Sequence, residues 1–218
     1  MRELTLTQEY FLCMMRKKGG TAADLAFEGQ VCLVAGVLYE LLLGGVVAQD
    51  EKKRLTVKRA LTPELVACAP VYDLLREKPL RAEKLCELYV FSTGKRIKEL
   101  AEVLARAMPD AAEVREKRGL FGRKTVFFPR AEAVDRVVEK LRAEFLEEGE
   151  LSDETAFLGE MLKASGVLKR YFSRYESERV KTRLKELKAS GRGELVQKMV
   201  CHVETLIAMT ASVAAGSN

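Results

Sequence analysis

Few residues in this sequence have the type and spacing that nucleophilic or metal chemistry requires. His202 is the single histidine, and catalysis by a serine or cysteine needs such a base beside the nucleophile. The five cysteines form no C-x-x-C pair, and all but Cys201 stand in apolar surroundings, as small buried hydrophobic residues do. No G-x-S-x-G, P-loop or G-x-G-x-x-G motif is present. We therefore predict a protein that is not an enzyme and holds neither a metal nor a cofactor.

Clustered cations are the residues with the clearest chemical potential, because lysine and arginine bind phosphate groups. The least balanced cluster, with Glu116 as its opposing charge, lies near the middle of the chain. Its candidate anion-binding residues are Arg106, Arg115, Lys117, Arg118, Arg123 and Lys124, and Arg130 follows them. Two further cationic groups occur at 52–59 and 169–188. Ordinary solvated surface is the alternative for every one of these groups.

The elements that must position these cations are predicted to be mostly helical. Apolar residues at 6, 10, 13 and 14 share one helical face within residues 4–17, and residues 27–43 are apolar nearly all round. The second of these is expected to be the central helix, ended by Gly44-Gly45. Further helical segments are predicted at 63–68, 71–76, 81–91, 95–108, 111–117, 131–148, 152–171, 176–189 and 194–215.

Two segments have the pattern of a β-hairpin instead. Residues 46–57 place β-prone residues on both sides of a charged tip, and residues 119–129 pass from glycine through a basic tip to a β-branched and aromatic return. Phe127 and Phe128 end the second segment. They are core residues or, alternatively, residues that insert into a membrane or a partner subunit; we take them as candidates for self-association.

Composition limits the class of protein further. The 218 residues are 48% hydrophobic and 32% charged with a net charge of +5, an ordinary globular mixture with a modest cationic surplus. No stretch approaches the roughly 18 uncharged apolar residues of a membrane-spanning helix. A secretion signal is not recognisable, so we expect a cytoplasmic protein. Without a low-complexity linker, residues 1–218 are predicted to form one mainly α domain around a central apolar helix, with two short β-hairpins.

The order of several short motifs resembles the Golgi phosphoprotein 3 family. Residues 4–12 (LTLTQEYFL) and 36–47 (GVLYELLLGGVV) are similar to the family's first helix and to its buried helix that leads into a hairpin. Residues 71–75 (VYDLL), 116–121 (EKRGLF) and 158–172 resemble later family segments. The resemblance is clearest over 4–187, and 194–215 would be an additional C-terminal helix. It fits a domain-only member of the bacterial type.

This resemblance implies a helical, peripheral membrane protein that binds phosphatidylinositol 4-phosphate in a basic pocket and, in eukaryotes, adapts Golgi enzymes to coat proteins. In some members the second hairpin mediates self-association, which would suit Phe127 and Phe128. The family pocket uses a Trp and three Arg residues. In the aligned register these fall near Leu25, Val34, Ala105 and Met108, so none of the four is retained.

Three functional hypotheses follow. The leading one is a non-enzymatic module that binds phosphoinositide or other anionic lipid on a membrane surface, to which basic clusters are attracted. A winged-helix-like nucleic-acid binder is the second, with residues 38–45 as recognition helix and the 46–57 hairpin as wing. That helix is too apolar to read base edges, so we expect no nucleic-acid partner. The third is a protein–protein adaptor that forms homo-oligomers through the second hairpin.

Overall fold

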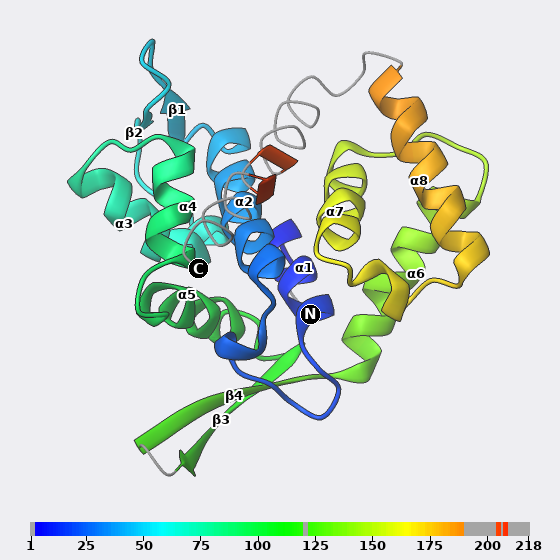
Figure 1. The fold of residues 1–218 in the computed structure, drawn as a ribbon, viewed down its shortest axis with the longest axis horizontal. Coiled ribbons are helices and arrows are strands. Elements are labelled where there is room, and N and C mark those ends of the chain that lie inside the picture. The colour runs from blue at the N-terminus through cyan, green and yellow to red at the C-terminus, as the bar shows by residue number, and fades with distance from the viewer. Residues whose placement is uncertain (1–2, 120–121, 190–203, 206, 209–218) are drawn as a thin grey trace.

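The computed structural model describes residues 3–119, 122–189, 204–205 and 207–208 (Figure 1). Within this part the chain forms eight α-helices, three short 3-10 helices and two antiparallel hairpins, which confirms the predicted mainly α class. The α-helices are α1 (Leu6–Met14), α2 (Phe27–Leu43), α3 (Ala69–Glu77), α4 (Ala82–Val90), α5 (Lys95–Arg106), α6 (Ala131–Leu146), α7 (Asp153–Ala164) and α8 (Arg174–Ala189). The 3-10 helices are η1 (Ala22–Asp24), η2 (Pro63–Cys68) and η3 (Leu168–Arg170).

Helices α1 and α2 form the centre of the molecule. Figure 1 shows them between α3, α4 and α5 on one side and α6, α7 and α8 on the other. Every residue of α1 is buried, and α2 is buried from Val31 to Leu41. Burial of so much apolar surface on all sides of a helix is the main stabilising contribution to its position. The predicted bounds of the central helix, 27–43, are confirmed.

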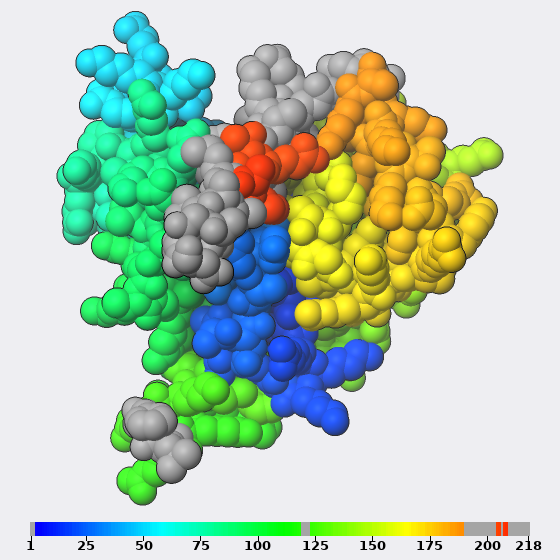
Figure 2. Space-filling model, in the orientation of Figure 1, coloured from blue at the N-terminus to red at the C-terminus, as the bar shows by residue number. Residues whose placement is uncertain are grey.

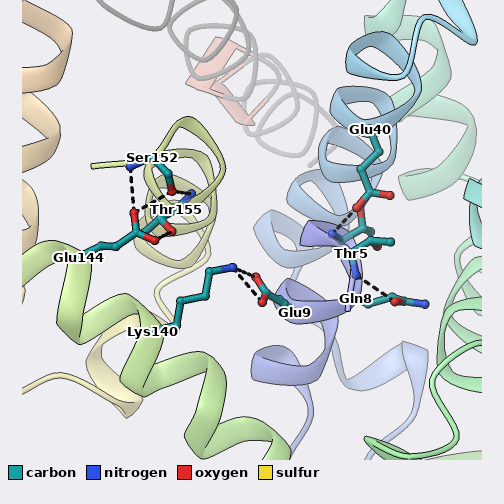
Figure 3. Close-up of polar contacts among 9 residues, drawn as sticks. Thr5, Gln8, Glu9, Glu40, Lys140, Glu144, Ser152 and Thr155 are labelled. Atoms are coloured by element: carbon teal, nitrogen blue, oxygen red, sulfur yellow. Dashed lines mark hydrogen bonds and ion pairs between the residues drawn. The ribbon is translucent and has the colours of Figure 1, made fainter. Parts of the chain in front are cut away.

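A buried carboxylate joins the two central helices. Glu40 of α2 accepts a hydrogen bond of 2.7 Å from the backbone N–H of Thr7, in the first turn of α1 (Figure 3). Its other oxygen lies 3.4 Å from the thiol of Cys68, which donates to it. A free N–H at a helix start is a favourable partner for a negative charge, so Glu40 stabilises the start of α1 from within the core.

The two hairpins project from opposite ends of the body, as Figures 1 and 2 show. The first consists of β1 (Val47–Gln49) and β2 (Leu55–Val57), and Leu55 also pairs with Leu80. The second consists of β3 (Ala112–Gly119) and β4 (Gly122–Pro129), whose register runs from Ala112 opposite Pro129 to Gly119 opposite Gly122. Backbone hydrogen bonds between Gly20 and Phe127, of 3.0 and 2.8 Å, attach β4 to the segment after α1.

Four predictions about the elements need correction. The helix predicted at 111–117 is wrong, because these residues form most of β3 and pair with β4. Arg123 and Lys124 are therefore the start of β4 rather than the hairpin tip. The single helix predicted at 152–171 is interrupted after Ala164, where Gly166 adopts a positive φ of 72° that ends a helix readily. The first helix is shorter than predicted, and the helix predicted at 194–215 falls mostly outside the described residues.

Candidate functional site

The candidate site is the β3–β4 hairpin, whose two faces differ at its base. On the inner face Phe127 is only 2% exposed, and its ring meets that of Phe11 edge-on with 5.6 Å between centroids. Thr125, two residues before it, is buried and donates its hydroxyl hydrogen to Glu102 of α5. These contacts fix the base of the hairpin on α1 and α5. Phe127 is thus a core residue and is not part of the exposed surface.

Phe128 lies on the opposite face, half-buried beneath two cations. The Arg115 guanidinium lies 4.8 Å from the centre of its ring, and the Lys117 Nζ lies 5.2 Å from it. Cations over an aromatic face are attracted by its quadrupole. Gly19 packs against the same ring so closely that an added Cβ would come within 2.4 Å of it. Self-association through the Phe128 ring would therefore have to displace Arg115, Lys117 or the segment at Gly19.

The cations of the hairpin are unevenly neutralised. Arg115 donates two hydrogen bonds, of 2.6 and 2.7 Å, to Glu113, and this pairing lowers the pKa of the Glu113 carboxyl. Arg123 lies 3.3 Å from Glu116 in an exposed ion pair. No carboxylate in the part of the chain that the structure describes lies within ion-pair distance of the remaining three. These are Lys117, Arg118 and Lys124.

The strand register brings like charges face to face. Lys117 stands directly opposite Lys124, and on the other face Arg118 stands opposite Arg123. Directly opposed side chains on antiparallel strands have Cβ atoms about 4.5–5.5 Å apart, and like charges in such pairs destabilise the hairpin. All four side chains are exposed. The outer half of the hairpin is therefore cationic on both faces.

Three further cations, not predicted from the sequence, extend this site. Arg16, Lys17 and Lys18 are exposed in the segment that follows α1, immediately before Gly19 and Gly20 attach it to β4. Asp24 lies near cations of both this segment and β4. Hydrogen bonds from Thr21 lower the pKa of the Asp24 carboxyl, and the nearby charges of Arg16 and Lys124 lower it further. The three successive cations before the Gly-Gly pair can be seen in the sequence. Only the pairing of Gly20 with β4 shows that they lie beside the hairpin.

We call this set of cations the basic hairpin surface. It consists of Arg16, Lys17, Lys18, Arg115, Lys117, Arg118, Arg123 and Lys124. Arg106, the sixth predicted residue, is exposed at the end of α5, and within the described residues no hydrogen bond or ion pair joins it to the hairpin. Five of the six predicted anion-binding residues thus lie on the hairpin, and the structure adds three neighbours to them.

The positions aligned with the family pocket are apolar. Leu25, Val34, Ala105 and Met108 are all buried, with Val34 and Ala105 completely inaccessible. The cavity beside Leu25, lined also by Phe11, Met14 and Phe127, has a volume of only about 10 Å³. That is barely the space of one water molecule, which needs about 10–15 Å³. A phosphoinositide head group therefore has no preformed pocket beside Leu25.

Four other kinds of site were considered: reactive thiols, a metal centre, a DNA recognition helix and a membrane-spanning helix. Burial raises the pKa of the thiols of Cys13 and Cys32 to about 12, so these groups are neutral and unreactive at pH 7. In the described ranges, no three His, Cys, Asp or Glu side chains are grouped as a metal site requires. Within residues 38–45, considered above as a recognition helix, Leu38–Leu41 are buried in the core and Leu43 is exposed. None of the helices described is both long and apolar enough to span a bilayer.

A comparison with protein families identifies the relationship. The model of the family Golgi phosphoprotein 3 (GPP34) matches residues 6–205 of this chain. The chain belongs to the Golgi phosphoprotein 3 family. This confirms the resemblance inferred from the short motifs, and the match extends beyond residue 187 to include the described residues 204 and 205. No curated protein matches the chain.

Proposed function

We propose that this Golgi phosphoprotein 3 family member is a non-enzymatic module that associates with anionic lipid membranes through its basic hairpin surface. The observation that carries the proposal is the pairing of Lys117 with Lys124 and of Arg118 with Arg123 across the strands. This arrangement costs folding free energy. Of its four cations, Arg123 pairs with Glu116 and Lys117 lies over the Phe128 ring, both in exposed positions. An anionic surface outside the protein would convert the same cations into a favourable interaction.

A membrane suits the shape of this surface. The cations lie on both faces of a projecting hairpin and on the segment beside its base (Figure 1). A layer of lipid head groups can surround such a projection. Because electrostatic attraction to a membrane depends on charge rather than on one fitted head group, we propose general anionic-lipid binding rather than selectivity for phosphatidylinositol 4-phosphate. The apolar residues at the aligned pocket positions support this choice.

The experiment is vesicle flotation with three lipid compositions. Vesicles of phosphatidylcholine alone are compared with vesicles that add phosphatidylserine, or phosphatidylinositol 4-phosphate at matched charge. We expect the protein to float with both anionic mixtures and not with phosphatidylcholine, and to dissociate as salt is raised because salt screens the attraction. Strong preference for phosphatidylinositol 4-phosphate at matched charge would contradict the general mode, and no flotation at low salt would contradict the proposal.

A charge-matched pair of variants locates the interaction. Lys117→Gln/Lys124→Gln removes two cations from the basic hairpin surface, whereas Lys169→Gln/Lys185→Gln removes two exposed cations from η3 and α8. Both double variants have the same net charge. We expect only the first to lose flotation. Equal losses in the two variants would mean that net charge, rather than the hairpin, determines membrane binding.

A further inference from the structure

A cavity of about 560 Å³ lies at the base of the β3–β4 hairpin. Three parts of the chain line it: the start of α1 with the residues before it, the connection 107–111 between α5 and β3, and one face of α6. Both strands of the hairpin lead into its walls, because β3 begins after this connection and β4 ends just before α6. The Arg130 N–H donates to the Ala111 carbonyl at 2.8 Å and closes this junction.

The size and the lining of the cavity are those of a ligand site rather than of a packing defect. Small-molecule pockets in proteins have volumes of about 300–1,000 Å³ and are mostly apolar with a few convergent polar groups. Much of this wall is apolar, with side chains of Leu4, Met108 and Val137 from its three parts. None of the cations of the basic hairpin surface lines the cavity, so the two features are separate.

An ion pair between α1 and α6 forms the polar part of the wall. The Lys140 ammonium lies 3.0 and 2.9 Å from the two carboxylate oxygens of Glu9 (Figure 3). The Glu9 side chain is only 11% exposed and that of Lys140 is 42% exposed, so the carboxylate is on the inner side and the ammonium reaches outward. Burial raises the pKa of Glu9 despite the partial compensation by Lys140.

Charges of both signs surround the opening. Arg136 lies one helical turn before Lys140 on α6, which places two cations on the same face of that helix. Glu3 and Asp110 supply carboxylates from the other two parts of the lining. A head group with a single charge would meet repulsion from one of these sets. A head group that holds both charges can place its anionic part near α6 and its cationic part near the carboxylates.

We propose that this cavity binds one single-chain amphiphile with a zwitterionic head group, whose chain packs against Leu4, Met108 and Val137. A lysophospholipid with an ethanolamine or choline head has this chemistry. The site is independent of membrane association by the basic hairpin surface, since the two use different residues. Binding here would stabilise the junction from which the hairpin projects.

The test is calorimetric titration of the full chain with three soluble amphiphiles that share one chain length. Decylphosphocholine, decyl sulfate and decyltrimethylammonium are each used below their micelle concentrations. We expect saturable one-to-one binding that is tightest for decylphosphocholine. Absence of saturable binding for all three would overturn the proposal, and tighter binding of either singly charged amphiphile would overturn the assignment of the head group.

A filling variant assigns the binding to the cavity. Ala107 is half-buried and lines the cavity, so Ala107→Phe fills part of its volume, whereas Ala143→Phe adds the same ring on the exposed side of α6. We expect at least tenfold weaker binding of decylphosphocholine for the first variant and no change for the second. Unchanged binding in Ala107→Phe would overturn the location.

A second variant keeps the test decisive if Ala107→Phe is poorly folded. Arg136 is exposed on α6, and Arg136→Gln leaves the apolar wall intact. We expect this variant to lose most of the preference for decylphosphocholine over decyltrimethylammonium while the latter binds at least as well as before. An unchanged preference would overturn the role of the α6 cations. Vesicle flotation of the same variant should be unaffected, which separates this site from the proposed function.

Discussion

The β1–β2 and β3–β4 hairpins both carry clustered cations, but they hold them in different ways. In the first, Asp50 accepts hydrogen bonds of 2.9 and 2.8 Å from the N–H groups of Lys52 and Arg54 and pairs with the Arg54 guanidinium at 2.8 Å. Its strands are three residues long and its cations surround an anion that organises the turn. In the second, strands of eight residues place cations opposite cations.

The two hairpins therefore illustrate the difference between structural and functional charge. A cation that neutralises a turn carboxylate stabilises the turn, whereas cations that stand opposite each other destabilise the strands that carry them. Both hairpins are anchored in the core: Leu55 and Phe127 are each 2% exposed, Leu55 forms a bridge to Leu80, and Phe127 forms a bridge to Gly20 and packs its ring on Phe11. A strong anchor permits a projecting segment to tolerate repulsion further out.

The largest expected effect tests this anchor. Truncation of a buried aromatic side chain costs about 3–5 kcal/mol, because the lost apolar contacts and the remaining cavity both contribute. Phe127→Ala should therefore lower the free energy of unfolding, measured by urea denaturation, by about this amount. The half-buried Phe128 should tolerate a change to Leu far better, since Arg115 and Lys117 rather than the core cover its ring. Similar losses for the two variants would contradict the division of the hairpin into a core face and an outer face.

The second prediction compares membrane binding by the two hairpins. Each Lys or Arg near an anionic membrane contributes about 1 kcal/mol, so Lys117→Gln/Lys124→Gln should weaken vesicle binding by about 2 kcal/mol, roughly thirtyfold. Lys52→Gln/Lys53→Gln removes two cations from the tip of the first hairpin, at the opposite end of the molecule. Quantitative sedimentation with phosphatidylserine vesicles should detect little change for this control. A thirtyfold loss there instead would assign the membrane surface to the first hairpin.

The third prediction concerns the cost of opposed charges. Arg118→Thr removes the repulsion from Arg123 and introduces a residue that strands favour, so it should raise the free energy of unfolding by about 0.2–1 kcal/mol. The same variant should bind anionic vesicles more weakly. Chemical denaturation and vesicle sedimentation on one sample measure the two quantities. If stability falls together with binding, the opposed cations have an internal role that the contacts do not explain.

The smallest expected effect is a local response of the first hairpin to acid. Hydrogen bonds from the Arg54 and Lys52 N–H groups, together with the Arg54 charge, lower the pKa of Asp50 below its ordinary value of 3.8. The pKa of Asp50 is lower in the folded protein than in the unfolded chain. The ionised carboxylate therefore stabilises the turn fully at pH values above its ordinary pKa, and this stabilisation is lost as the pH falls through the lowered pKa. The amide resonances of Lys52 and Arg54 should shift in an NMR titration below pH 3.8. A midpoint above that value would show that these hydrogen bonds do not hold the carboxylate.

Periodicity in the sequence predicted much of the fold but not the extent of the second hairpin. The apolar segment 27–43 can only be a buried helix, and its bounds were predicted correctly. Residues 111–117 (AAEVREK) are mostly alanine, glutamate, arginine and lysine, which favour helix locally. They form a strand because pairing with β4 and burial of Phe127 outweigh that local preference.

The site was predictable to the extent that it is contiguous in the chain. Arg115, Lys117, Arg118, Arg123 and Lys124 were recognised because they flank one glycine-containing segment. Arg16, Lys17 and Lys18 join the same surface only through the backbone hydrogen bonds between Gly20 and Phe127. These two residues are more than a hundred positions apart in the chain, so no local sequence pattern predicts their contact. The cavity at the hairpin base likewise depends on three distant segments.

The backbone hydrogen bonds between Gly20 and Phe127 also cover part of one edge of the β3–β4 sheet. A two-stranded sheet has two outer edges, and each offers unpaired backbone groups to which another strand can add. Gly20 occupies part of the β4 edge, and along the described part of β3 no strand or bridge occupies the other. Glu113, Arg115, Lys117 and Arg118 line that open strand. Charged residues at an exposed edge oppose strand addition, so the same cations that we assign to membrane attraction also protect the sheet from growing into an aggregate.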